Sequence, residues 1–137
     1  MNEYEIRKFV MERYGVRLPK NLRLLAVGNK VRAFVEHPEI KMKFSYPFLF
    51  ARVSKSIKIT TNAMQMFFEG ATKNVVYLDK KMAMDFVRGF DVEIPNADAD
   101  KGYVVVKWKH VLGCGFYDQP TLINNIPKHR ILRRVNI

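Results

Sequence analysis

The last third of the chain, from Val92 onward, lacks the spacing of an amphipathic helix and alternates short β-rich runs with turn signals. The turn signals fall at residues 95–100, at residues 109–110 and at residues 118–120. Turn-forming residues between apolar runs end one strand and start the next. Several short strands at this spacing are typical of a small barrel. The sequence therefore predicts a small β-barrel for this region.

A strand and a capped helix precede the predicted barrel. Residues 75–78 form a short apolar run, which predicts a strand. The Asp79 side chain can accept hydrogen bonds from the free amides of a first helical turn, and Gly89 suits a helix end. We therefore expect a helix over residues 80–88. Further upstream, Thr61 or Asn62 is expected to cap a short helix that runs through Phe68, near Gly70.

The first part of the chain predicts one helix followed by four strands. Apolar residues at spacings of three and four predict a helix over residues 3–14, which Gly15 ends. The Gly28-Asn29 pair between two β-rich runs, residues 22–27 and 31–35, predicts a tight hairpin. Two further strands are expected over residues 48–53 and 57–60, after a loop with Pro38 and Pro47. Lys and Arg alternate with apolar residues there, so one face of that sheet should be positive.

The predicted elements give an α+β protein with two small parts. The 137 residues suffice for one ordinary domain or two very small ones. The expected boundary lies between Gly70 and Val75, which places an N-terminal α+β domain at residues 1–72 and a second domain at residues 73–137. No Ser/Gly-rich linker separates them, so we expect the two domains to pack as a rigid unit.

Net charge is the strongest compositional clue to function. The chain has 24 Lys and Arg against 13 Asp and Glu, a net charge of +11. By segment the net charge is +8 for residues 1–60, −3 for residues 61–100 and +6 for residues 101–137. A protein this basic attracts polyanions. The alternative is a solvated basic surface that only aids solubility.

Other sequence features exclude several classes of protein. No apolar run approaches the roughly 20 residues of a membrane-spanning helix. The acidic Glu3 and Glu5 at the start are unlike a secretory signal. Cys114 is the single cysteine, so it has no partner for an intramolecular disulfide, and no Cys/His cluster has zinc spacing. We expect a cytoplasmic protein with no metal, no other cofactor and no membrane partner.

Four landmarks from residue 74 onward resemble a known family. They are the helix end Val87-Arg88-Gly89, the strand at residues 102–106, the segment at residues 112–115, and the segment from Leu122 to Arg130. Their order resembles a PUA-like domain, the RNA-binding module of RNA-modifying enzymes. It is most similar to the version at the C-terminus of Nol1/Nop2/Sun-type RNA cytosine-5 methyltransferases. Residues 48–70 more loosely resemble the domain that often precedes it, so residues 1–72 are read as a pre-PUA-like domain.

The resemblance implies an RNA-binding site in the C-terminal domain. Two positions depart from the family pattern: Asn124 replaces a lysine, and Phe116 stands where a lysine often follows the glycine pair. PUA-like domains resemble one another in contacting RNA where the helix ends, here at Arg88 and Gly89. Basic side chains after Pro127 can contact phosphate as point charges and planar forks. The candidate RNA-binding residues are Arg88, Gly89, Lys107, Lys109, Gly113, Gly115, Asn125, Lys128, Arg130, Arg133 and Arg134.

Two of these groups have alternative interpretations. Lys107 and Lys109 flank Trp108, so on a regular strand they share the face opposite the indole. Either Trp108 is core and the lysines face RNA, or the indole stacks on bases and the lysines are solvated. Gly113 and Gly115 either let RNA approach the backbone or mark a barrel corner, and the corner is the better reading.

Catalysis finds little support in the sequence. No glycine-rich phosphate loop or known Ser/His/Asp order occurs. Cys114 lies between two glycines, whereas the catalytic cysteine of the resembled methyltransferases lies beside a proline. We expect a non-catalytic protein that binds structured RNA, tRNA or rRNA, and assists an RNA-modifying enzyme or pre-ribosomal particle. The alternatives are an assembly factor whose basic surface docks on an acidic partner, and a small enzyme with an unrecognised site.

Overall fold

The computed structural model describes residues 1–36 and 47–130 of the chain. Helix α1 (Glu3–Tyr14) begins with a capping box in which the Asn2 side chain accepts from the Glu5 amide. It ends at Gly15, whose φ of 68° lies in the left-handed region that glycine adopts without a Cβ clash. The helix predicted over residues 3–14 is confirmed.

In the described residues, the N-terminal sheet contains four antiparallel strands in chain order. These are β1 (Leu22–Val27), β2 (Lys30–Val35), β3 (Phe48–Val53) and β4 (Ile57–Ile59). Gly28, with φ of 61°, makes the predicted β1–β2 hairpin. All four predicted strands are confirmed to within a residue at each end. Of the loop between β2 and β3, residues 37–46 lie outside the described residues, and Pro38 is one of them.

Helix α2 (Thr61–Phe67) follows β4 directly, and its cap differs from the expectation. The cap is Thr60, whose Oγ1 accepts from the Ala63 amide at 3.2 Å, rather than Thr61 or Asn62. Thr61 is buried and has another partner, since its Oγ1 accepts from the Cys114 amide at 3.1 Å. The sequence offers several adjacent hydroxyl and amide side chains here, and the contact between Thr61 and Cys114 is not visible in it.

Up to residue 130, the C-terminal part consists of five strands, one α-helix and one short 3-10 helix. In chain order they are β5 (Val75–Tyr77), α3 (Lys80–Val87), β6 (Val92–Glu93), β7 (Gly102–Trp108), β8 (His110–Asp118), β9 (Thr121–Asn124) and η1 (Lys128–Arg130). Asp79 caps α3 as predicted, because its side chain accepts from the Met82 amide at 2.8 Å. The sheet order is β5-β7-β8-β9-β6, with β5 parallel to β7 and the other pairs antiparallel.

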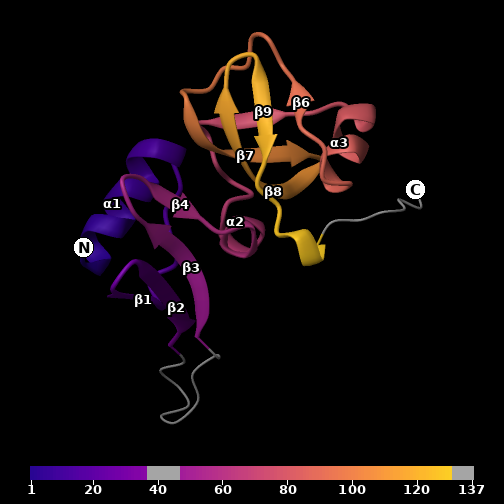
Figure 1. Cartoon of the computed structure of the whole chain (residues 1–137). Coiled ribbons are helices and arrows are strands. Elements are labelled where there is room, and N and C mark those ends of the chain that lie inside the picture. The colour runs from indigo at the N-terminus through magenta and orange to yellow at the C-terminus, as the bar shows by residue number, and fades with distance from the viewer. Residues whose placement is uncertain (37–46, 131–137) are drawn as a thin grey trace.

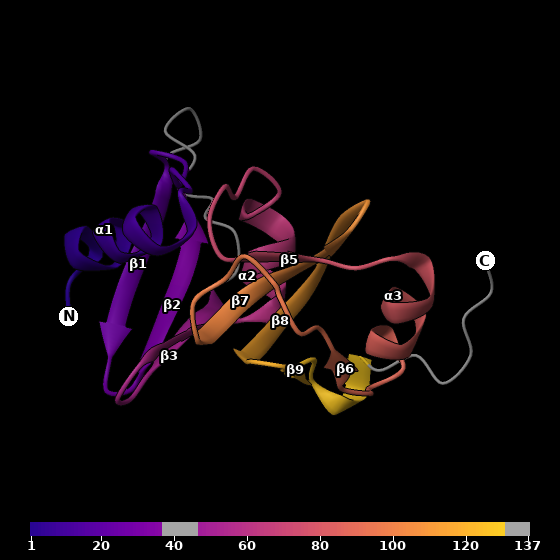
Figure 2. The same cartoon turned by 90° about the horizontal axis from the view of Figure 1, so that it is seen from above.

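This five-stranded sheet curls into a half-barrel with α3 at one end, beside the N-terminal sheet and its helix (Figure 1). The predicted α+β class, with short helices and a C-terminal β-rich part, is confirmed. Figure 2 shows the two parts from above, with α2 lying where they meet. In the ranges 1–36 and 47–130, no helix has the length and apolar character needed to cross a membrane.

The curled sheet separates two hydrophobic cores. Val105, Val111 and Cys114 point into the larger core, which they share with α1, α2 and the N-terminal sheet. Val104, Val106, Tyr117 and Leu122 point to the opposite side and pack with Ala83 and Phe86 of α3. Alternate residues of one strand therefore serve different cores, as the two-residue period of a strand dictates. The larger core contains residues from both sides of the proposed domain boundary at residue 72.

Candidate nucleic-acid interface

The end of α3 presents the Arg88 side chain rather than free backbone amides. The amides of Arg88, Gly89 and Phe90 donate to the carbonyls of Met84, Phe86 and Asp85, at 3.2, 3.0 and 3.0 Å. These bonds form the usual C-terminal closure of a helix. An RNA contact at Arg88 and Gly89 would therefore not use these amides as free donors, and the contact itself stays a prediction. The Arg88 side chain remains exposed, with its guanidinium carbon 5.9 Å from the Phe90 ring centre.

Asn124 fixes the segment that leads to the basic C-terminal residues. Its Nδ2 donates to the carbonyls of Phe86 at 2.6 Å and Phe90 at 3.1 Å. Its Oδ1 accepts from the Ile126 amide at 2.9 Å, and its own amide donates to Asp91 Oδ1 at 2.8 Å. These contacts fasten residues 124–126 to the end of α3. Sequence reasoning missed this role, although the replacement of a family lysine at this position marked it as unusual.

Lys107 and Lys109 do not share one strand face. The register shift between Val106 and Lys107 leaves the extra residue, Leu112, in β8, so β7 keeps its alternation and Lys107 lies opposite the Trp108 indole. Lys109 instead lies in the turn after β7, with φ of 62°. Lys109 Nζ lies 4.8 Å from the centre of the Trp108 ring, so it is on the indole side rather than opposite it. Trp108 is half-buried against the smaller core, which supports the packing interpretation of the indole.

Lys107 is engaged within the protein. Its Nζ donates to the Glu69 carbonyl at 2.9 Å and lies 3.3 Å from Glu69 Oε2. A lysine held by both a carbonyl and a carboxylate is less available to phosphate than an exposed one. Of the two lysines beside Trp108, Lys109 is therefore the one available to RNA, at the tip of the β7–β8 hairpin.

Gly113 and Gly115 are buried, and protein atoms rather than a ligand fill the space beside them. A Cβ on Gly115 would lie 2.8 Å from Leu122 Cδ1 and 2.9 Å from Val106 Cγ2. A Cβ on Gly113 would lie 2.9 Å from Thr61 Cγ2. The two glycines therefore allow close packing inside the protein. We correct the expectation that RNA approaches the backbone at these positions.

Cys114 has the environment of a packing residue. It is fully buried between the two glycines, and burial raises the pKa of its thiol to about 12. A thiolate is the nucleophilic form of cysteine, so a raised pKa disfavours nucleophilic use. The described residues contain no group of three His, Cys, Asp or Glu side chains placed to hold a metal ion.

The C-terminal segment contacts the N-terminal sheet through Asn125 and carries the exposed Lys128. Asn125 Oδ1 accepts from Lys58 Nζ at 2.9 Å, so this candidate residue contacts the N-terminal sheet. Lys128 is exposed in η1, which also includes the backbone of Arg130. The predicted contacts of Arg133 and Arg134 lie outside the described residues.

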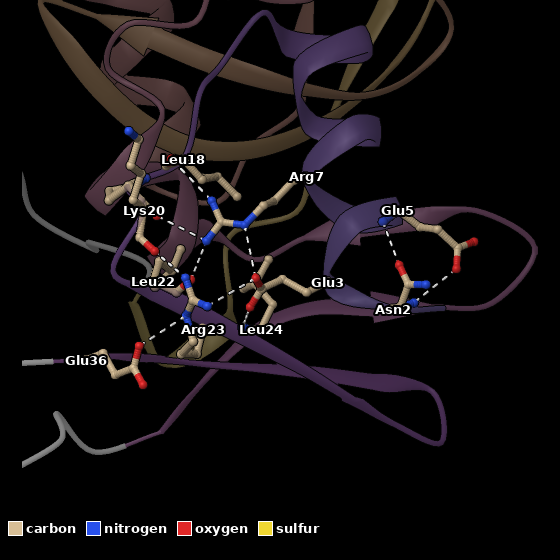
Figure 3. Close-up of polar contacts among 11 residues, drawn as sticks. Asn2, Glu3, Glu5, Arg7, Leu18, Lys20, Leu22, Arg23, Leu24 and Glu36 are labelled. Atoms are coloured by element: carbon tan, nitrogen blue, oxygen red, sulfur yellow. Dashed lines mark hydrogen bonds and ion pairs between the residues drawn. The ribbon is translucent and has the colours of Figure 1, made fainter.

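Several arginines near the N-terminus have structural partners. Arg7 donates to the carbonyls of Leu18 at 3.3 Å and Pro19 at 3.1 Å, and to that of Leu22 (Figure 3). Arg23 pairs with Glu3 at 3.7 Å and Glu36 at 3.6 Å. Such bonds hold α1 against β1 and neutralise part of the positive charge. The cations available to a polyanion are therefore fewer than the sequence count suggests.

Comparison with known families agrees with the architecture of the C-terminal part. Helix α3 and the curled five-stranded sheet form a PUA-like domain. Residues 73–132 match the family described as the PUA domain of the methyltransferase RsmF. This part of the chain is thus a PUA-like domain of the kind that Sun-type RNA methyltransferases carry, and the match includes no methyltransferase domain. A search of curated proteins found no match to the chain.

Proposed function

We propose that this protein is a non-catalytic RNA-binding protein that recognises structured RNA through its C-terminal domain. The observation that carries the proposal is the match of residues 73–132 to the PUA domain of an RNA methyltransferase. The net charge of +11 supports it, because basic proteins gain affinity for RNA by releasing counterions. The exposed side chains of Arg88, Lys109 and Lys128 supply cations on the surface of that domain.

The RNA we propose is tRNA or rRNA, and the setting is RNA modification or ribosome biogenesis in the cytoplasm. Two observations support an accessory role. The matched domain belongs to a methyltransferase family, whereas Cys114, the cysteine of this chain, is buried with a raised pKa. The protein would then deliver or hold RNA for an RNA-modifying enzyme or a pre-ribosomal particle.

The experiment is a fluorescence titration of the full chain with unfractionated tRNA at salt concentrations from about 50 to about 200 mM. We expect binding that weakens steeply with salt, since each phosphate contact releases about 0.7–0.9 counterion. A polyglutamate competitor at equal charge concentration should displace the protein far less than unlabelled tRNA. Absence of tRNA binding at the lowest salt would overturn the proposal, and equal displacement would favour an acidic protein partner.

A further inference from the structure

The N-terminal sheet carries a row of cations that crosses three strands. Lys30 of β2 lies directly opposite Arg52 of β3, and Arg52 lies directly opposite Lys58 of β4. Arg32 of β2 lies two residues beyond Lys30, on the same side of the sheet. We call Lys30, Arg32, Arg52 and Lys58 the cationic row.

This row lies on the face of the sheet that α1 and α2 leave open. The neighbours of the row, Val31, Ala51 and Ile59, point the other way and are fully buried in the larger core. On the open face, Lys30, Arg32 and Arg52 are exposed, and so is Val27, at 68%. Figure 2 shows the sheet with α1 along one of its sides. The sheet thus has one buried face and one that solvent reaches.

Like charges directly opposite each other on adjacent strands destabilise a sheet. No acidic residue occurs between positions 47 and 68, so β3 and β4 supply no compensating charge. Glu36, which directly follows β2, already forms an ion pair with Arg23. Within the described part of the chain, Lys30, Arg32 and Arg52 form no ion pair. An external polyanion would relieve this repulsion.

The row is continuous with the C-terminal domain. Lys58, at its end, donates to Asn125 Oδ1 at 2.9 Å, and its Nζ lies 5.7 Å from the centre of the Tyr103 ring. Asn125 immediately precedes the segment that carries Lys128. A linear polyanion held by the C-terminal domain near Lys128 can therefore continue over β4, β3 and β2.

We propose that the cationic row binds the phosphate backbone of RNA, so that one RNA molecule spans the open face of the N-terminal sheet and the PUA-like domain. This inference rests on the proposed function. The charge complementarity favours RNA over a peptide, because a row of cations matches a repeating line of phosphates. Arginine at the centre of the row can also contact one phosphate with two parallel hydrogen bonds.

The test removes three exposed charges together: Lys30→Gln, Arg32→Gln and Arg52→Gln. The matched control changes Arg17, Lys20 and Lys73 to Gln, which removes the same charge from exposed positions outside the sheet face. Binding of unfractionated tRNA is measured across the same salt range for both variants. The row variant should weaken binding at about 100 mM salt by roughly tenfold or more, and lower the salt slope by roughly 2 to 3 relative to the control.

A second readout separates a binding role from a structural one. Without RNA, the melting temperature of the row variant should equal or exceed that of the wild-type protein, because like-charge repulsion is removed. If the triple variant does not fold, the single Arg52→Gln variant should still lower the salt slope by about 0.7–0.9. If the wild type binds tRNA and the row variant matches the control, this inference fails and the proposed function stands. If the wild type itself does not bind tRNA, both fail.

Discussion

At the scale of single residues, glycines that resembled a ligand site prove to be packing positions. Gly115 is surrounded by Leu122 and Val106 from neighbouring strands, and Gly113 by Thr61 from α2. The sequence indicates that the space beside these two positions is small, but it does not indicate whether a ligand or other protein side chains fill that space. Only the register of β8 against β7 and β9 reveals that side chains from the protein occupy the space.

Replacing Gly115 by Ala should destabilise the protein. The new Cβ would lie under 3.0 Å from two aliphatic carbons and 3.3 Å from the Ile123 carbonyl oxygen. Overpacking of this kind costs roughly 1–3 kcal/mol, which chemical denaturation can measure. Gly70→Ala is the control, because nothing lies within 4 Å of its Cβ position. A Gly115→Ala variant as stable as the control would contradict this prediction, because it would mean that the neighbouring strands shift to accommodate the added methyl group at little cost.

The same scale explains which site residues could be predicted. Lys128 and Lys109 are exposed cations, as the sequence suggested, because charged side chains in turns stay solvated. Lys109 was misplaced because it lies in the turn after β7 at a positive φ, and the sequence does not mark where the strand ends. Lys107 lies opposite the indole as predicted, but Glu69 holds it. Asn124 was not chosen because its partners, Phe86 and Phe90, lie over thirty residues earlier in the chain.

At the scale of elements, Glu69 fastens the β7–β8 hairpin to the end of α2. Glu69 Oε1 accepts from the Val111 amide at 2.8 Å, while Oε2 lies 3.3 Å from Lys107 Nζ. The Val111 hydrogen bond and the ion pair with Lys107 lower the pKa of the Glu69 carboxyl. The charged form of Glu69 is thus the form that stabilises the hairpin.

The pH dependence of this contact has a definite sign. A lowered pKa in the folded state means that the stabilisation is complete above the unfolded pKa of about 4.3 and disappears as the pH falls through the folded value. Glu69→Gln keeps an oxygen for the Val111 amide but has no charge. Melting temperatures should therefore differ between wild type and variant near neutral pH and converge in acid. A difference that stays constant into acid would contradict the role of the Glu69 charge.

Cap and turn residues in the sequence predicted the helices and strands better than they predicted how the strands pair. Asp79 and Gly15 mark helix ends, and the Gly28-Asn29 pair marks a hairpin, because each acts through backbone groups only a few residues away. The parallel pairing of β5 with β7 was not predicted, since the two strands are separated by α3 and β6. The cap of α2 was expected at Thr61 or Asn62 and lies at Thr60, while the Thr61 hydroxyl accepts from the distant Cys114 amide.

At the scale of the whole molecule, one core joins the N-terminal sheet to the PUA-like domain. Val105 and Cys114 pack with Phe50, Phe68 and Tyr14 in that core. The sequence predicted a positive face on the N-terminal sheet, but the cross-strand pairs of the cationic row depend on strand register, which the sequence leaves open. The shared core packs the strands that carry that face against β7 and β8 of the PUA-like domain.

The most direct test of RNA binding through the C-terminal domain compares two quadruple variants of the full chain. One changes Lys128, Arg130, Arg133 and Arg134 to Ala. The control changes the exposed Lys8, Arg17, Lys20 and Lys73 to Ala, which removes equal charge. Arg7 and Arg13 stay in place, because they are half-buried and each makes more than one hydrogen bond to backbone carbonyls.

The measurement is the salt dependence of tRNA affinity for both variants and the wild type. The C-terminal variant should lower the salt slope by roughly 0.7–0.9 for each phosphate that it no longer binds, with the circular dichroism spectrum unchanged. The control should lower the slope far less. Equal reductions in both variants would contradict a localised site and show that diffuse net charge attracts the RNA.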